Sequence, residues 1–96
     1  MSHPLVVHCM KEKFDVYVGR KHKNFPEGSK WGNPFYLSDE SKREEVLYKY
    51  INWLMTQDEL LSQIHQLKGK KLGCWCAPKL CHAEILAKLA NDEELE

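Results

Sequence analysis

The sequence predicts a small α/β domain in which helices pack on a three-stranded sheet, with the elements in the order β-β-α-α-β-α. Three short apolar runs have the character of β-strands, and two longer segments carry apolar stripes at helical intervals. A chain of 96 residues suffices for one modest core but not for two. We therefore expect a single domain over residues 1–96, with an ordered core at 4–91 and a frayed acidic tail at 92–96.

The first two strands are expected at residues 4–9 and 14–18, where apolar side chains alternate along the chain. The segment between them is too short for a crossover to a parallel neighbour, so a β-hairpin is the simplest connection. In such a hairpin Cys9 lies away from the other cysteines and packs as a small apolar residue.

Two helices are expected between residues 41 and 69. Ser41 with Glu44, and Thr56 with Glu59, have capping-box spacing, and Gly69 is suited to end the second helix. The apolar stripe of the first helix is Val46, Leu47, Tyr50, Ile51 and Leu54, and that of the second is Leu60, Leu61, Ile64 and Leu67.

A third strand at residues 70–76 and a last helix at about 81–91 complete the chain. The helices between the second and third strands act as a crossover, so these two strands are expected to be parallel. This arrangement corresponds to half of a Rossmann-like fold.

The charge balance excludes several classes of partner. Lys plus Arg and Asp plus Glu number 14 each, so no global field attracts nucleic acid or a membrane surface. No apolar run approaches the ~20 residues of a membrane span, and the N-terminal residues lack the basic-then-apolar pattern of a signal peptide. We expect a cytoplasmic protein whose four cysteines are thiols or metal ligands rather than disulfides. The oligomeric state is left open.

The segment from Gly19 to Leu37 lacks a helical or strand period and is rich in glycine, proline and basic residues. Glycine lets a backbone approach a phosphate, arginine can grip it as a fork, and an aromatic ring can stack on a base. These properties favour a small anionic, nucleotide-like ligand. The alternative for the aromatic residues is that Trp31 and Phe35 fill the core. The candidate ligand-binding residues are Gly19, Arg20, Lys30, Trp31 and Asn33.

Three of the four cysteines lie in one short stretch with a histidine, Cys74, Cys76, Cys81 and His82. As a metal set they resemble the ligands of a zinc site, but Cys-x-Cys followed by adjacent Cys-His departs from the usual Cys-x-x-Cys knuckle. Alternatively, Cys81 stands at the N-cap of the last helix, where backbone N–H groups would lower its pKa and make it reactive. The thiols can also pack as buried apolar groups.

The preferred interpretation is a site without a cofactor, in which Cys76, Cys81 and His82 are the catalytic candidates. If the second and third strands are parallel, their carboxyl ends share one edge of the sheet. Ligands in open α/β sheets bind outside that edge. Arg20 follows one strand and Cys76 ends the other, so they are expected to form two walls of one pocket.

Three segments of the sequence resemble a known family. They are Val-Tyr-Val-Gly-Arg at 16–20, Lys-Trp-Gly-Asn-Pro-Phe at 30–35, and Leu-Gly-Cys-Trp-Cys-Ala-Pro-Lys-Leu-Cys-His-Ala-Glu-Ile-Leu at 72–86. Together they resemble the domain of unknown function 4326 family, small single-domain proteins of bacteriophages and bacteria. The resemblance implies that the three segments belong to one site, and it implies no reaction.

The leading hypothesis is thus a phage or bacterial protein that binds or processes an anionic, nucleotide-like ligand through Arg20 and the Cys/His cluster. The alternative hypothesis is a metal-stapled module, holding zinc or iron, that engages a host protein or nucleic acid.

Overall fold

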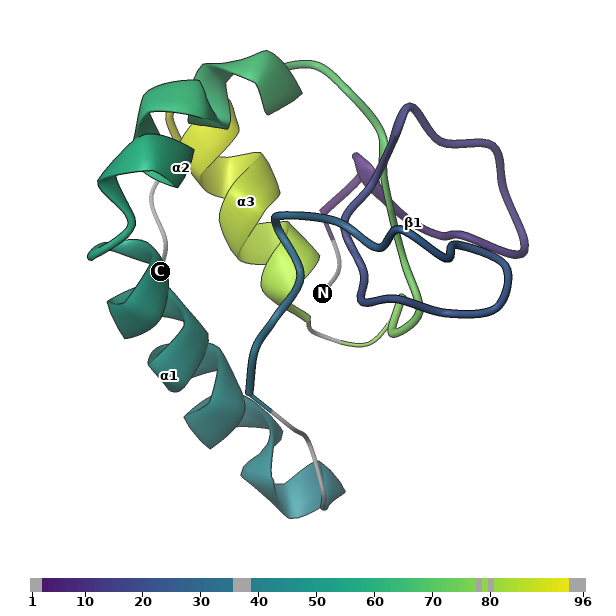
Figure 1. Ribbon diagram of the computed structural model, residues 1–96, viewed down its shortest axis with the longest axis horizontal. Helices are drawn as coiled ribbons and strands as arrows, with labels where there is room; N and C mark the ends of the chain where they lie inside the picture. Colours follow the sequence, from purple (N-terminus) through teal and green to yellow (C-terminus); the bar gives the residue numbers. More distant parts are fainter. Residues whose placement is uncertain (1–2, 36–38, 78, 80, 94–96) are drawn as a thin grey trace.

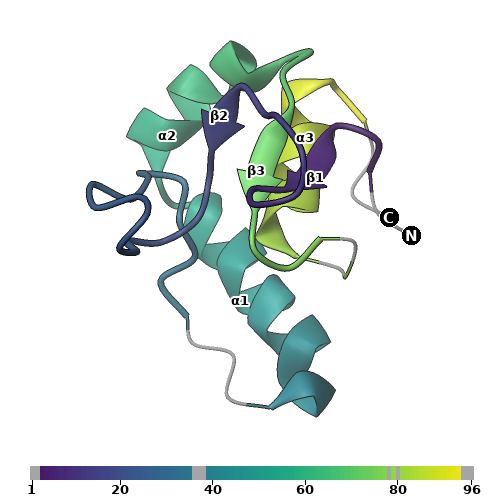
Figure 2. The same cartoon turned by 90° about the vertical axis from the view of Figure 1, so that its right-hand side faces the viewer.

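The computed structural model describes residues 3–35, 39–77, 79 and 81–93. Its sheet consists of β1 (Val6–His8), β3 (Leu72–Cys74) and β2 (Val16–Tyr17), in the spatial order β1-β3-β2 (Figure 2). Both outer strands run parallel to β3, and Val6 and Val16 share Leu72 as their register partner. The predicted α/β class and the parallel pairing of the second and third strands are confirmed.

The predicted β-hairpin is wrong, because β1 and β2 do not pair with each other but lie on either side of β3. Strands of two or three residues are only about 7–10 Å long at ~3.3 Å per residue. Residues 9–15 can therefore return the chain to the starting end without a helix. One consequence concerns Cys9, whose backbone N–H donates to the carbonyl of Cys74 at 2.9 Å. Cys9 thus lies at the same sheet edge as the cysteine cluster.

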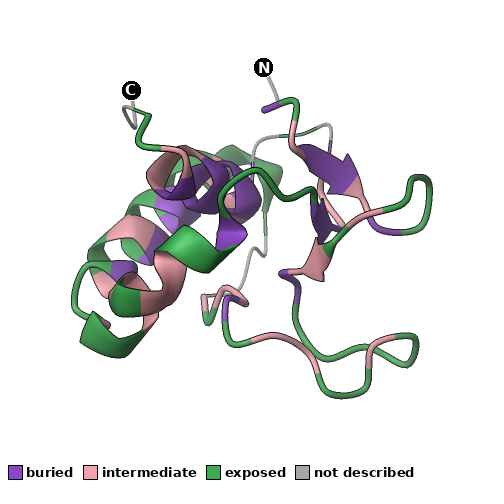
Figure 3. Cartoon of the chain, turned by 90° about the horizontal axis from the view of Figure 1, so that it is seen from above, coloured by how far each residue is buried: buried purple, intermediate pink, exposed green. Residues whose placement is uncertain are grey.

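The helical segments are a 3-10 turn at Glu40–Lys42, α1 (Arg43–Leu54), α2 (Asp58–Gln63), a second 3-10 turn at Ile64–Leu67, and α3 (His82–Ala90). In Figure 1 they lie on one side of the molecule and the N-terminal loops on the other. Buried residues concentrate on α3, β1 and β3 (Figure 3). None of the helices in the described ranges is long and apolar enough to cross a membrane.

The helix boundaries match the sequence pattern, but the caps do not. Asp39, rather than Ser41, caps the first helical segment, since its carboxylate accepts the N–H of Ser41 at 3.0 Å. The Thr56 hydroxyl donates to the carbonyl of Trp53 at 2.7 Å and does not cap α2, whose N-cap residue is Gln57. The break near Thr56 is nevertheless present, and Gly69 adopts the positive φ of a helix terminator, +73°.

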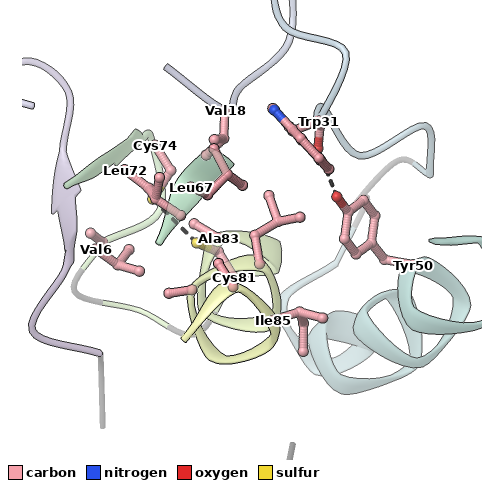
Figure 4. Packing of buried hydrophobic residues seen from close by; sticks show 14 of the residues in the cluster. Val6, Val18, Trp31, Tyr50, Leu67, Leu72, Cys74, Cys81, Ala83 and Ile85 are labelled. Carbon is pink, nitrogen blue, oxygen red and sulfur yellow. Dashed lines mark hydrogen bonds between the residues drawn. The ribbon is translucent and has the colours of Figure 1, made fainter. Parts of the chain in front are cut away.

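The core lies between α3, α1 and the sheet (Figure 4). Tyr50 of α1 is fully buried, and its hydroxyl donates to the carbonyl of Trp31 at 2.8 Å. This bond joins the loop before α1 to the helix itself. The largest fully buried side chains are Tyr50, Leu54, Leu72, Leu86, Val18 and Cys74.

Aromatic side chains, rather than helices, cover the other face of the sheet. The rings of Tyr17 and Phe25 stack with centroids 3.9 Å apart, and Trp75 Nε1 donates to the Tyr17 hydroxyl at 2.8 Å. A Cβ on Gly73 would come within 2.7 Å of the Phe14 ring, so the absence of a side chain on this strand lets the ring lie against it. Cys74 and Trp75 accordingly face opposite sides of the sheet.

The chain terminus is fastened through residue 93. The N–H of Glu93 donates to the carbonyl of Lys88 at 2.7 Å, and its carboxylate bonds His3 Nε2 at 2.9 Å. The expected fraying of residues 92–96 stays a prediction. Residues 94–96 lie outside the described part of the chain.

Candidate functional site

A cavity of about 430 Å³ lies beyond the carboxyl ends of β2 and β3. One wall comes from the segment after β2, a second from the start of α1, and the floor from the end of β3 and the start of α3. Its lining residues are Gly19, Arg20, Lys21, His22, Asn33, Phe35, Arg43, Val46, Leu47, Cys74, Trp75, Cys76, Cys81 and His82. Six of the eight predicted catalytic and ligand-binding residues thus share this cavity, namely Gly19, Arg20, Asn33, Cys76, Cys81 and His82, and Cys74 of the alternative metal set lines it as well.

Arg20 shapes the cavity wall through backbone contacts. Its Nε donates to the carbonyl of Asn33 at 2.7 Å, and its Nη2 donates to the carbonyl of Phe35. The backbone of Arg20 is held in turn, because its carbonyl accepts the Tyr17 hydroxyl at 2.6 Å. A guanidinium that bridges two carbonyls fixes the Asn33–Phe35 turn against the end of β2. Arg20 is therefore a structural clamp as well as a positive charge at the cavity.

Lys30 and Trp31 do not line the cavity. The Trp31 ring is only 3 % exposed and belongs to the hydrophobic core, which is the alternative that the sequence left open. Lys30 bonds the side-chain oxygen of Gln63 and places its ammonium 5.5 Å from the centre of the Trp31 ring. Both residues hold the loop against the helices.

The three clustered cysteines meet at the cavity floor with different exposures. Cys74 and Cys81 are buried, at 1 % and 3 %, and their sulfur atoms lie 3.2 Å apart (Figure 4). Cys76 is half-buried. The Cys81 thiol also affects the ionisation of Cys76, so its own ionisation is coupled to both of the other thiols.

The pKa values of these thiols separate strongly. The hydrogen bond from Cys81 and the neighbouring Arg43 guanidinium outweigh burial and lower the pKa of Cys76 to about 5. The hydrogen bond from Cys81 likewise lowers the pKa of Cys74, to about 7. Donation to both sulfurs, together with burial, raises the pKa of Cys81 far above its usual value. At neutral pH Cys76 is a thiolate and Cys81 is its hydrogen-bond donor.

The predicted low pKa of Cys81 is therefore wrong. Cys81 does occupy the N-cap position of α3, but its side chain makes no capping hydrogen bond. The Ala83 N–H lowers the pKa of Cys81, but the interactions with Cys74 and Cys76 and the burial of the thiol raise it by more. Its neighbours thus turn the Cys81 thiol into a donor, and the thiol whose pKa is lowered furthest is Cys76.

The His82 ring is bonded to the backbone that follows β2. Its Nε2 lies 2.6 Å from the carbonyl of Val18, which fixes the neutral tautomer with the proton on Nε2. Burial, aided by the Arg20 charge, lowers the pKa of His82 to about 4. The Tyr50 ring packs edge-on against the imidazole at 5.0 Å. Although part of its surface borders the cavity, the ring is neutral at pH 7 and is anchored to β2.

Sequence reasoning missed Arg43, which lies at the start of α1. The Glu40 carboxylate receives two bonds from this guanidinium, at 2.8 and 2.9 Å, and one from Lys79 Nζ at 3.1 Å. These cations lower the pKa of Glu40 to about 2. The signal in the sequence was an arginine in the first turn of a helix, where the dipole disfavours a cation, three residues after a glutamate.

The metal-site alternative receives no geometric support from the part of the chain that the structure describes. Within it, no group of three or more His, Cys, Asp and Glu side chains is arranged to hold an ion. Nε2 of His82 is committed to the carbonyl of Val18, so within the predicted set of Cys74, Cys76, Cys81 and His82 only Nδ1 of that ring keeps a lone pair.

The fold and cavity together define a class, a small α/β protein with a basic, thiol-lined pocket at the carboxyl edge of a parallel sheet. The model of the family called domain of unknown function (DUF4326) matches residues 7–92, and the chain belongs to this family.

Two relatives are viral. An uncharacterized protein, R718, of Acanthamoeba polyphaga mimivirus is 36 % identical over 86 residues, which cover 79 % of this chain and 65 % of that protein. An uncharacterized 12.4 kDa protein from the nrdA-td intergenic region of Enterobacteria phage T4 is 33 % identical over 90 residues, which cover 90 % of this chain and 76 % of that protein. The chain therefore spans just under two thirds of the mimivirus relative. No solved structure matches the chain.

Proposed function

We propose that the cavity binds a small anionic, nucleotide-like ligand in the cytoplasm, with Cys76 as the reactive group beside it. The observation that carries this proposal is the charge of the lining. Arg20, Lys21 and Arg43 line the cavity, and none of its described lining residues is an aspartate or glutamate. An anion that enters the cavity therefore meets three cations.

The charges beside the lining leave this balance positive. Adding the Lys79 ammonium and the Glu40 carboxylate, which pair next to Arg43, gives four cations against one carboxylate and the Cys76 thiolate. Because Cys74, with a pKa of about 7, is about half ionised, the cluster keeps a net charge between about +1 and +2 at neutral pH. Because Arg43 already holds Glu40, Lys21 is the group expected to receive a phosphate, with Arg43 adding positive charge beside it.

The remainder of the lining suits a heteroaromatic ring. His22 and Trp75 pack with ring centroids 4.4 Å apart at one side of the cavity, and Phe35, Val46 and Leu47 provide apolar surface at another. A volume of about 430 Å³ lies in the range of small-molecule sites. A flat base against these rings, with its phosphate toward Lys21 and Arg43, uses both halves of the lining.

Calorimetric titration with a panel of nucleotides and the corresponding nucleosides tests the proposal. We expect binding of at least one nucleotide, no binding of its nucleoside, and a loss of tenfold or more in affinity for Arg43→Met and Lys21→Met. Lys49→Met is the matched control, since Lys49 is exposed on α1 and does not line the cavity. Affinity that survives both substitutions, or that does not distinguish nucleotide from nucleoside, contradicts the proposal.

Arg20→Ala is a poor probe of binding, because it also releases the carbonyls of Asn33 and Phe35. Cys81→Ser is also a poor probe of binding, because Cys81 is buried in the core and its substitution can alter the framework. The Arg43 and Lys21 variants test the charge of the cavity with less risk to the framework, and their melting temperatures should be compared with that of the native chain.

A further inference from the structure

The three thiols at the cavity floor differ in access. Cys76 and Cys81 both border the cavity, but Cys76 is half-buried whereas Cys81 is buried. The sulfur of Cys81 lies 3.2 Å from that of Cys74, and Cys81 also interacts with Cys76. An accessible thiolate backed by a buried thiol is the arrangement that thiol–disulfide exchange requires, one sulfur to attack and a second to resolve.

We propose that the pocket carries out thiol–disulfide exchange on a small anionic disulfide, with Cys76 as the attacking thiol and Cys81 as the resolving thiol. The proposal rests on the proposed function in one respect, that the same basic pocket receives the anion. It adds a reaction and assigns each sulfur a role.

The first step uses the Cys76 thiolate as nucleophile. Its sulfur attacks one sulfur of the substrate, the substrate S–S bond breaks, and one half leaves as a thiolate. A mixed disulfide between Cys76 and the other half remains. The Arg43 guanidinium beside Cys76 holds the attacking sulfur deprotonated, and Arg20 and Lys21 attract the acidic groups of the substrate.

The second step uses Cys81. The thiol gives its proton to the departed thiolate, its sulfur attacks that of Cys76, and the bond from Cys76 to the substrate breaks. The second half leaves as a thiolate, and a Cys76–Cys81 disulfide remains. Two electrons pass from the protein to the substrate in total. A dithiol reductant, reacting by the same chemistry in reverse, returns the protein to its starting state.

The environment of the two thiols fixes the order of these steps. Cys76 is ionised at neutral pH and reachable from the cavity, so it reacts first. Cys81 is protonated and enclosed, so it reacts only once Cys76 has been converted to a disulfide and no longer takes its hydrogen bond. Because a thiol with a low pKa is a good leaving group, the Cys76–Cys81 disulfide is expected to be readily reduced.

In the test, the fully reduced chain is mixed with oxidised glutathione at pH 6.5. Samples are quenched with acid at intervals, and the masses of the products are measured by mass spectrometry. The native chain should release two equivalents of reduced glutathione and lose two hydrogens in mass. Cys81→Ser should stop at the mixed disulfide, carrying one glutathione on Cys76. Cys76→Ser should react at least tenfold more slowly. Cys9→Ser, which alters a buried cysteine outside the cavity lining, is the matched control and should behave as the native chain.

Two results would overturn the proposal. In one, Cys76→Ser reacts as fast as the native chain. In the other, Cys81→Ser reacts without accumulating the glutathione adduct. The preference for an anionic substrate has its own test, in which oxidised 2-mercaptoethanol, a neutral disulfide, replaces oxidised glutathione at low ionic strength. Each rate is divided by the rate of the same disulfide with a small free thiol, which corrects for intrinsic reactivity. The corrected rate of the neutral disulfide should be several-fold lower, and equal corrected rates contradict an anionic substrate.

The same variants separate this inference from the proposed function. If the native chain binds a nucleotide but forms no Cys76–Cys81 disulfide, the exchange reaction is wrong and the binding site stands. If it exchanges disulfides through Cys76 and Cys81 but binds no nucleotide, the proposed function is wrong and the thiol chemistry stands.

Discussion

The hydroxyl of Tyr50 donates to the backbone carbonyl of Trp31 at 2.8 Å inside the core. This bond is the direct link between α1 and the loop that carries Asn33 and Phe35 to the cavity. Because both partners are buried, the carbonyl has no access to water if the hydroxyl is removed. The loop wall of the cavity therefore depends on a tyrosine that does not itself line the cavity.

Tyr50→Phe tests this link. It leaves the Trp31 carbonyl without a donor, and we expect the free energy of unfolding to fall by about 1–3 kcal/mol. Urea denaturation followed by tryptophan fluorescence measures the change. The control is Tyr48→Phe, because Tyr48 is 67 % exposed on the same helix and should change stability by less than about 0.5 kcal/mol. Equal effects of the two substitutions would show that the buried bond contributes nothing.

The ionisation of Cys76 is a second prediction. Since its pKa is lowered to about 5, its alkylation by iodoacetamide should rise between pH 4 and 6 and then level off. An ordinary thiol, with a pKa near 9, would still be rising at pH 8. Arg43→Met removes one of the stabilising groups and should move the midpoint upward by about one pH unit or more. Peptide mapping after brief labelling identifies the residue. A midpoint near 9 in the native chain would rule out the thiolate.

The lowered pKa of His82 leads us to expect a loss of stability in acid. Its pKa in the folded chain is about 4, against 6.5 for a free histidine. Between these values the unfolded chain binds a proton that the folded chain does not, so the free energy of unfolding decreases as the pH falls. The loss from this group between pH 6.5 and 5 should be about 2 kcal/mol.

The measurement is a difference between variants, since Cys76 and Glu40 also respond to acid. The native chain should lose more stability on acidification than His82→Asn, whereas His65→Asn, at an exposed position, should follow the native chain. If His82→Asn retains the full pH dependence, the imidazole is not held neutral by burial.

A side chain at Gly73 is expected to clash with the aromatic residues that cover this face of the sheet. A methyl group at this position would lie 2.7–3.0 Å from the Phe14 ring, so Gly73→Ala should displace the ring and cost about 1–3 kcal/mol of stability. Combining it with Phe14→Ala removes the clash. The double variant should therefore be more stable than the sum of the two single effects predicts. Simple additivity in denaturant titrations would show that Phe14 does not lie on Gly73.

The amino-acid sequence by itself determined the elements and the direction of their connections. The stripe through Leu47, Tyr50 and Leu54 specified a buried helix, and the alternation at Cys74 and Trp75 specified opposite faces of a strand. The crossover between β2 and β3 then predicted their parallel pairing, which brings the segments after Gly19 and Cys74 to one edge of the sheet. These are consequences of local periodicity and connection length, which a single chain displays directly.

Only the tertiary structure decided the pairing of β1, the place of Trp31 and the ionisation of the thiols. A strand of three residues does not specify its neighbour, because its partner depends on what fills the centre of the sheet. Trp31 could stack on a ligand or fill the core, and its burial in the folded chain places it in the core. The pKa values of Cys76 and Cys81 are set by Arg43 and by each other across space. Charges and hydrogen bonds between distant segments act over a few ångströms, and such distances exist only once the chain has folded.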